Sequence, residues 1–495
     1  MKNFKRFSVV VLLTGAILIS CGVNRTDKEP DDSLKQPDEA TESADPRFTP
    51  NLPDMDFDGY EFRSLTGHWY QTTTTFNAEE ETGDTINDAI YSRNRCIEEK
   101  FNVVFVQIDV ADHNVARANF TKSVLAASDD FDLCATVDFY CAALAAEGYV
   151  LSADNLPYVD LTQPWYMRDV NDAMSLGNKC YIVYGDECIN AYESALAVCF
   201  NKKLIADYTL ENPYEIVNGG KWTFDKFFEM SRSAATDLNG DGVMDDADRY
   251  GIVTYTDLFG DMIWGSCGIR TVTKDPDGML ILNVDGNEKF FSILDKCYLA
   301  VNGGEKIYFN SSKDKTTVYK ASGESGGSRD ISRQQFENDL GLFHPLILGW
   351  LPPLRGMETD FGVIPTPKYD ESQTRYYALL GNVWPKVVPV TASDRERTSI
   401  LVEALAAESR NTTTPAFKET CLKTKFTRDN ESEGTVEIIF NSMFIDPGVN
   451  IYLEVGSLFF LEFAGSGNFT SVWEKNAAKL QKGLDTMNEN LLNLK

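Results

Sequence analysis

One stretch of the chain carries side chains whose types and spacing could bind a metal ion. Residues 237–248 read DLNGDGVMDDAD, with oxygen-bearing side chains at alternating positions and a glycine at the sixth position. This spacing matches a calcium-binding loop, in which alternating groups converge on one ion because the chain curls around it. The residues that would bind the ion are Asp237, Asn239, Asp241, Val243 (through its backbone carbonyl), Asp245 and Asp248.

The loop departs from the standard pattern at its last position, where Asp248 stands in place of the long bidentate glutamate. The following residues, 249–255, have the composition of a strand rather than of a second helix. We therefore expect one structural calcium ion that stiffens the loop and has no catalytic or signalling role. The alternative is an Asx-rich turn without a metal.

The elements that would position functional side chains alternate in the first part of the chain. The pattern predicts a strand at 60–65, a helix capped by Asp84 or Thr85 that runs to about 101, a strand at 103–108, a helix at 113–127 and a strand at 131–136. Such alternation is typical of a parallel α/β sheet, in which ligands bind beyond the carboxyl ends of the strands. His68 and Trp69 follow the first strand and Asp138 follows the third, so we expect them at one site.

Two further helices have clear sequence signals. Thr223 is predicted to cap a helix that buries three phenylalanines, and Ser471 with Glu474 forms a capping-box pattern near the C-terminus. That last helix carries an apolar seam, which we expect to pack in the core. The seam consists of Trp473, Ala477, Leu480, Leu484, Met487 and Leu491.

The composition describes a folded, acidic protein. Of 495 residues, 43% are hydrophobic and 12% aromatic, and the formal net charge of −29 argues against nucleic acid as a partner. The ten cysteines show no CxxC spacing, so neither a zinc site nor a small disulfide framework is expected. No metalloprotease motif, nucleophile elbow or phosphate-binding loop is present. We expect no cofactor apart from the calcium ion.

The N-terminus has the features of an export signal. Lys2, Lys5 and Arg6 precede an uncharged run at 7–20, which has the length of a signal-peptide core and is too short for a transmembrane helix. The run ends in the letters LISC, which resemble the bacterial lipobox, where the cysteine is acylated and the preceding peptide is removed. An ordinary signal peptide with an incidental cysteine is the alternative.

The lipobox assigns a role to the whole N-terminal region. We expect a lipoprotein signal peptide at 1–20, acylation of Cys21 and a flexible acidic tether at 21–54, since this segment has too few apolar residues to fold. The mature protein would then be lipid-anchored at the extracellular face of the cell membrane.

Several phrases farther along the chain resemble, in their order, the extracellular solute-binding proteins of ABC importers, in their carbohydrate-binding group. Among them are GKWTFD at 220–225, FGVIPTPKYD at 361–370 and EALAAES at 403–409. The resemblance covers nearly all of residues 55–495 and implies two α/β lobes joined by crossing segments, with the ligand in the cleft between them. Lobe 1 would comprise 55–195 and 360–415, and lobe 2 would comprise 196–358 and 416–495.

The resemblance in layout also implies which side chains border the cleft. Aromatic rings cover the flat faces of a sugar, while side chains such as Asp, Asn and Arg pair with its hydroxyl groups. We expect at least two of five tryptophans to contact ligand, and for each of them a place in the core is the alternative. The expected ligand-binding residues are His68, Trp69, Asp138, Trp165, Asp257, Phe259, Trp264, Trp350, Arg355, Asn382 and Trp384.

The function that the resemblance implies is that of a lipid-anchored receptor. It would bind a small solute, expected to be a carbohydrate, and deliver it to the permease subunits of an ABC transporter, with no catalytic residue of its own. Two alternatives stay open at this point: a surface carbohydrate-active enzyme with paired carboxylates, and a solute receptor that feeds a sensor kinase.

Overall fold

A computed structural model describes residues 47–68, 75–304, 306–310, 328–420, 431–463 and 465–493. The chain divides into residues 1–47 and a compact unit, Phe48–Lys495, and the structure described below is that of the compact unit. The signal peptide, Cys21 and most of the tether lie outside the described residues. Within the described ranges, no helix has both the length and the apolar character needed to cross a membrane.

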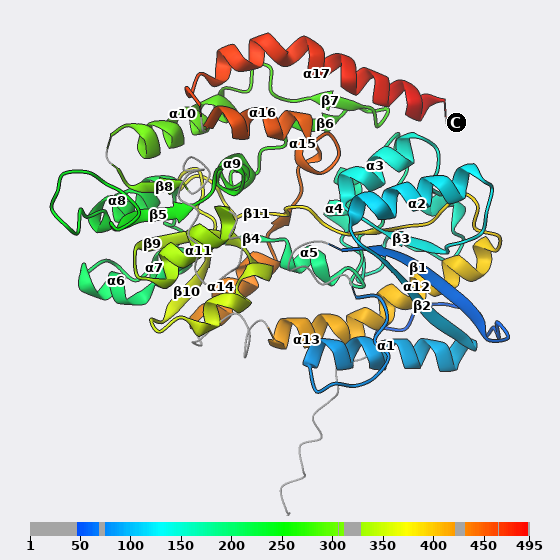
Figure 1. The fold of residues 1–495 in the computed structure, drawn as a ribbon. Helices are drawn as coiled ribbons and strands as arrows, with labels where there is room; N and C mark the ends of the chain where they lie inside the picture. The colour runs from blue at the N-terminus through cyan, green and yellow to red at the C-terminus, as the bar shows by residue number, and fades with distance from the viewer. Residues whose placement is uncertain are drawn as a thin grey trace, which may run out of the picture. The chain divides into compact units, whose positions relative to one another are not determined.

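The first sheet has four strands in the order β12-β3-β1-β2. β1 (Tyr60–Gly67) pairs in parallel with β2 (Val103–Val110) and β3 (Leu133–Ala135), and β12 (Lys386–Val387) pairs antiparallel to β3. Between these strands come α1 (Thr85–Phe101) and α2 (His113–Leu125), and α3 (Asp138–Ala146) follows β3. Figure 1 shows α2 and α3 on one side of this sheet and α1 on the other. The predicted alternation of strands and helices is confirmed.

The second sheet has five strands in the order β10-β4-β9-β5-β8. β4 pairs antiparallel to both β10 and β9, whereas β5 pairs in parallel with β9 and β8. The strands span β4 (Leu196–Asn201), β5 (Tyr250–Thr254), β8 (Tyr308–Asn310), β9 (Gly341–Ile347) and β10 (Phe361–Pro365). α8 (Phe224–Ala234) packs on β5, and Thr223 caps it as predicted, because its side chain accepts a hydrogen bond from the Lys226 amide.

The remaining elements connect and cover these two sheets. The helices are α4 (Arg168–Met174), α5 (Ile189–Glu193), α6 (Lys202–Asp207), α7 (Pro213–Asn218), α9 (Thr256–Gly265), α10 (Glu288–Asn302), α11 (Ser328–Glu337), α12 (Arg395–Asn411), α13 (Thr413–Thr420), α14 (Glu431–Phe440), α15 (Pro447–Asn450), α16 (Glu454–Phe463) and α17 (Phe469–Leu492). Two small sheets pair β6 (Val272–Lys274) with β7 (Leu280–Leu282), and β11 (Ala378–Leu379) with β13 (Met443–Phe444). Three short 3₁₀ helices are η1 (Ala153–Asn155), η2 (Leu348–Trp350) and η3 (Pro352–Gly356).

The chain passes between the two sheets at segments that lie side by side. One passage runs through Ser194 and Ala195 into β4, and another, residues 380–384, runs from β11 toward β12. Ala195 forms an antiparallel bridge with Leu380, and the Gly381 amide donates to the Ser194 carbonyl at 2.9 Å. These paired backbones form the connection between the two sheets.

One predicted boundary needs correction. The predicted first lobe included residues 360–415, but its opening strand, β10, is fully buried and pairs with β4 in the second sheet. β12 and α12, later in the same range, do lie with the first sheet, since β12 pairs with β3 and α12 packs on α1. The chain therefore leaves the second sheet after β10 rather than before it.

The last helix begins earlier than its capping pattern suggested. α17 starts at Phe469, and the Asn468 side chain caps it by accepting from the Ser471 amide, so Ser471 is not the cap. The expected seam does face the protein: Trp473, Leu480, Leu484 and Leu491 are buried, and α17 packs on α10, α16, β7 and α3 (Figure 1, red).

Candidate ligand-binding site

Two predicted site residues lie beyond the strands of the first sheet, as expected, but in different environments. His68 follows β1 and is 44% exposed, with its Nε2 at 2.8 Å from Oδ1 of Asp109. Asp138 is the first residue of α3 and is fully buried. Trp69, which was predicted at the same site, lies outside the described residues.

Three of the predicted ligand-binding aromatic residues lie in the core instead. Trp165 is 3% exposed, and its indole N–H donates to Glu403 at 3.2 Å. Trp264 is fully buried and donates to Asp446 at 3.1 Å, and Phe259 packs between other aromatic rings with no exposed surface. All three rings lie in the core, and the indole N–H groups of Trp165 and Trp264 already have partners inside the protein. Their contact with ligand stays a prediction.

The other predicted residues are scattered. Trp384 is 3% exposed and lies edge-on to His113 at 6.3 Å, whereas Trp350 is half-buried against Tyr255 at 5.9 Å. Arg355 and Asn382 are exposed. Asp257 belongs to α9, and its side chain lies outside the described part of the chain. None of these described side chains lines the two cavities presented below.

The side chains of the acidic loop accept hydrogen bonds from backbone amides of the loop itself. The Asp237 carboxylate accepts from the amides of Gly240 at 2.7 Å and Gly242 at 2.8 Å, and both glycines adopt a positive φ that the turn requires. The next two acceptors work in the same way, because Asn239 accepts from the Asp241 amide and Asp241 accepts from the Val243 amide.

The end of the loop is closed by Asp248. Its two carboxylate oxygens accept from the amides of Leu238 at 2.8 Å and Asp245 at 2.9 Å, which holds the pKa of Asp248 below its ordinary value. Among the described residues, no group of three or more metal-ligating side chains converges. An Asx-rich turn therefore accounts for these contacts, and the calcium ion stays a prediction.

One cavity, of about 500 Å³, lies between α3 and the C-terminal helices and is lined by both aromatic and hydrogen-bonding side chains. Its aromatic residues are Phe139 and Tyr140 on α3 and Tyr452 opposite. Its charged and amide residues are Arg117, Glu454, Asn476 and Lys479. Flat rings and hydrogen-bonding groups therefore face one space from both walls.

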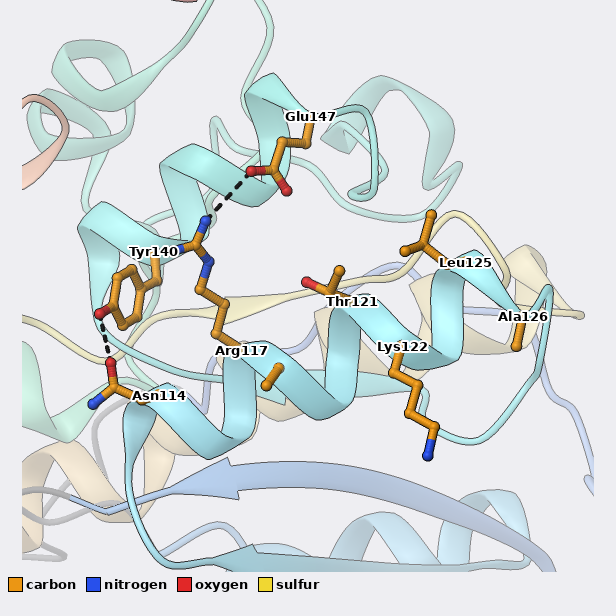
Figure 2. A pocket seen from close by; sticks show the side chains of 9 residues that line it. Asn114, Arg117, Thr121, Lys122, Leu125, Ala126, Tyr140 and Glu147 are labelled. Carbon is orange, nitrogen blue, oxygen red and sulfur yellow. Dashed lines mark hydrogen bonds and ion pairs between the residues drawn. The ribbon is translucent and has the colours of Figure 1, made fainter.

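The α2–α3 wall is held in place by a chain of contacts (Figure 2). The Tyr140 hydroxyl donates to Oδ1 of Asn114 at 2.6 Å, and the guanidinium of Arg117 lies 4.8 Å from the centre of the Tyr140 ring. Arg117 also pairs with Glu147 at 3.3 Å. Phe139 packs edge-on against Tyr140 at 4.7 Å. The tyrosine ring thus has a fixed position between a cation and a second ring.

A second cavity of about 880 Å³ adjoins the first along α2 and α3. Arg117 and Tyr140 line both, so the two form one groove, which we call the α3 groove. Its outer part is lined by Thr121, Lys122 and the 68% exposed Leu125 (Figure 2). Such a groove can hold a polyhydroxylated chain longer than one ring, since pockets of roughly 300–1,000 Å³ hold ordinary small ligands.

The opposite wall of the cavity includes Tyr452, Glu454, Asn476 and Lys479. Tyr452 is half-buried and donates from its hydroxyl to the Leu480 carbonyl at 3.2 Å, while Glu454 and Lys479 are exposed. The Asn476 amide donates to Val472, one turn earlier on α17. These groups offer both donors and acceptors to a bound molecule.

None of the expected ligand-binding residues that the structure describes lines the α3 groove, although Phe139 directly follows one of them, Asp138. Tyr140 carried a local signal, because it follows Phe139 directly after a strand whose carboxyl end was expected to border the site. Arg117 and Tyr452 carried none: one lies within a predicted helix, and the other lies far along the chain in a segment without a motif.

No protein-family model and no curated protein matches this chain. Solved structures do match it. An ABC substrate-binding protein from Listeria monocytogenes in complex with cycloalternan has a TM-score of 0.52 and 14% identity, covering 88% of this chain and 99% of that chain. UgpB from Mycobacterium tuberculosis in complex with glycerophosphocholine has the same four values. A sugar transporter protein from Rhizobium etli in an open conformation has a TM-score of 0.54 and 12% identity, covering 88% and 100%.

The chain has their two-lobed α/β fold. The predicted fold class, that of the periplasmic-binding proteins, is confirmed. At 12–14% identity, the fold is what this chain shares with these proteins.

Proposed function

We propose that this protein is a solute receptor that binds a carbohydrate, an oligosaccharide in particular, in the α3 groove. The observation that carries the proposal is the lining of that groove, where Phe139, Tyr140 and Tyr452 present rings while Arg117 and Lys479 present donors. Rings and planar polar groups of this kind suit the alternating apolar faces and hydroxyl edges of sugars. The shared fold supports the proposal, because a neighbour with this fold binds cycloalternan.

Ligand capture would be a change of conformational population, with no bond made or broken. The groove takes residues from α2 and α3, which follow strands of the first sheet, and from residues 451–453, α16 and α17, of which α16 packs on α9. A ligand that contacts both walls binds the conformation in which they are close and therefore shifts the population toward it.

The full role that we propose is delivery of the captured sugar to the permease subunits of an ABC transporter. Acylation of Cys21 and the tether at 21–54 would hold the receptor at the extracellular face of the membrane, where the permease is. The lipobox-like sequence and the export signal support this part of the proposal.

A thermal-shift experiment on the full chain tests ligand binding. Maltotetraose and cycloalternan serve as neutral oligosaccharides, with glycerophosphocholine as a phosphodiester. An oligosaccharide should raise Tm, because a ligand at about one hundred times its Kd stabilises the folded state by about 2.7 kcal/mol. A shift with glycerophosphocholine alone would contradict the carbohydrate class, and cleavage of the oligosaccharide would contradict the receptor role.

Two tyrosine variants locate the site. Tyr140→Ala removes the ring at the junction of the two cavities and should abolish the shift. Tyr91→Ala is the matched control, because Tyr91 is also half-buried and also lies beside an arginine, Arg95, but it is on α1, away from the groove. Equal loss in both variants would place the ligand elsewhere.

A further inference from the structure

Asp138 connects three segments at the point where the chain crosses between the lobes. Its amide donates to the Val383 carbonyl at 2.9 Å, and its Oδ2 accepts from the Val383 amide at 3.3 Å. The same oxygen accepts from Nδ2 of Asn450 at 2.6 Å, and Oδ1 accepts from the Phe139 amide at 2.9 Å. One buried carboxyl therefore joins α3, the crossing segment 380–384 and the end of α15.

These three segments belong to different bodies. α3 follows β3 of the first sheet, whereas α15 leads into α16, which packs on α9 beside the second sheet. Nδ2 of Asn450 also donates to the Gly381 carbonyl at 3.1 Å, so the asparagine holds the crossing segment from the other side. Any motion that separates α3 from α15 must break the contact between Asp138 and Asn450.

Within the described part of the chain, the Asp138 carboxyl has no positively charged partner. No lysine or arginine of the described chain pairs with Asp138, and the titratable groups that face it are Tyr184, Cys141 and Cys188, none of which carries a positive charge. Full burial raises the pKa of Asp138 to about 8, although four N–H groups, those of Asn450, Val383, Phe139 and Asp138 itself, act in the opposite direction. Burial without a neighbouring cation therefore favours the neutral form of the carboxyl.

We propose that Asp138, Val383 and Asn450 form a clasp that holds the lobes together, and that a negative charge on Asp138 releases it. Separation of α3 from α15 admits water to the carboxyl, and water stabilises the charged form. The open state then binds the proton less tightly than the clasped state, so a rise in pH favours the open state by linkage. Between pH 6 and pH 9 the ratio of open to clasped molecules should rise roughly tenfold to hundredfold.

This regulation rests on the proposed function, because opening of the clasp would separate the two walls of the α3 groove. The clasp itself can be measured without any ligand. Its failure is therefore distinguishable from a failure of carbohydrate binding.

Hydrogen exchange on the ligand-free full chain measures the clasp. Protection factors, corrected for the intrinsic pH dependence of exchange, are compared at pH 6 and pH 9 for residues 380–384 and, as an internal control, for the buried strand β4. We expect protection at 380–384 to fall at least tenfold and to stay well below that of β4 at both pH values, since the clasp opens without global unfolding. No fall at 380–384, or protection equal to that of β4 at both pH values, would overturn the proposal, since equal protection reports global unfolding.

Asp138→Asn keeps the shape of the side chain and removes its charge, so protection at 380–384 should be the same at both pH values. Glu403→Gln is the matched control. Glu403 is also a buried carboxyl with a pKa raised by burial, to about 7, but its partners, Trp165, Tyr166 and the amide of Asp160, all belong to the predicted first lobe. This variant should retain the wild-type fall. The proposal would be overturned if protection at 380–384 fell with pH in Asp138→Asn as it does in the wild type. It would also be overturned if that protection did not fall in Glu403→Gln.

A second variant keeps the proposal testable if Asp138→Asn does not fold. Oδ1 of Asn450 has no hydrogen-bond partner in the described structure, so Asn450→Ala removes only the two bonds from Nδ2 and leaves the Asp138 carboxyl in place. Protection at 380–384 should then be reduced already at pH 6. Wild-type protection at pH 6 in this variant would overturn the clasp.

Discussion

The acidic loop and the α3 groove are built in opposite ways. The loop at 237–248 is one run of residues whose spacing indicates metal chemistry, yet its carboxylates accept hydrogen bonds from neighbouring backbone amides. The groove has no motif and collects residues from α2, α3 and the C-terminal helices, yet Arg117, Lys479 and three aromatic rings face its cavity. A strong local pattern can thus stabilise a turn, while a binding surface arises from segments that only the fold brings together.

The largest effect should come from the groove. Arg117→Ala removes the cation above Tyr140 and the ion pair with Glu147, and we expect oligosaccharide affinity to fall about a hundredfold, or about 2.7 kcal/mol. Arg95→Ala is the matched control, because Arg95 also lies over a tyrosine ring and pairs with a glutamate, but on α1. Isothermal titration of both variants decides, and an Arg117→Ala protein with wild-type affinity would remove the groove from the binding site.

A substitution in the acidic loop should lower the stability of the protein and leave its affinity for oligosaccharide unchanged. Asp248→Ala leaves the amides of Leu238 and Asp245 without their acceptor, and we expect the free energy of unfolding to fall by about 2 kcal/mol. Urea unfolding in the presence of a chelator measures this loss without a contribution from calcium. If the variant instead bound oligosaccharide less tightly, the separation between loop and groove would be wrong.

The pH dependence of the free energy of unfolding tests a third region, the buried core around Glu403. Burial raises the pKa of Glu403 to about 7, so the protonated form is favoured in the folded state, and its stabilisation is lost as the pH rises from about 4.3 through 7. Between pH 5 and pH 7 this group alone should lower the free energy of unfolding by about 2 kcal/mol. Urea unfolding should show that loss in the wild type and a smaller one in Glu403→Gln, and equal losses would contradict the assignment.

The smallest effect is expected from calcium. If the loop binds the ion as its spacing predicts, calorimetric titration of the chelator-treated full chain should give heat, and calcium at ten times its Kd should stabilise the fold by about 1.4 kcal/mol. Asp237→Asn, which keeps a side-chain oxygen and removes a charge, should reduce both. The absence of heat at millimolar calcium would leave the Asx-rich turn as the whole explanation.

The successful sequence predictions rest on short-range physics. Asp84 caps α1 through the amides of Ile86 and Asn87, and the alternation of strands and helices before residue 136 follows from apolar periodicity. The cap of α17 was misplaced because Ser471 and Asn468 are both good capping residues, and only the path of the chain before the helix selects between them. Local patterns therefore predict the presence of a helix or strand more reliably than its first residue.

The site was harder to predict, because tryptophan suits a sugar and a core equally well. Trp165 and Trp264 became core residues because each found a buried carboxylate for its N–H, Glu403 and Asp446, and those partners lie far away in the chain. Asp138 was expected to meet ligand for a sound reason, its position after a strand. Its contact with Asn450, which lies hundreds of residues later, could not be anticipated from sequence.

The first sheet has a consequence for how the protein is made. β12, which completes that sheet beside β3, is synthesised only after every strand of the second sheet has been made. Until then the β3 edge has unpaired backbone groups, and such an edge can pair with other chains. A nascent chain therefore cannot complete its first sheet until residue 387 has been made, and the β3 edge must avoid pairing with other chains until then.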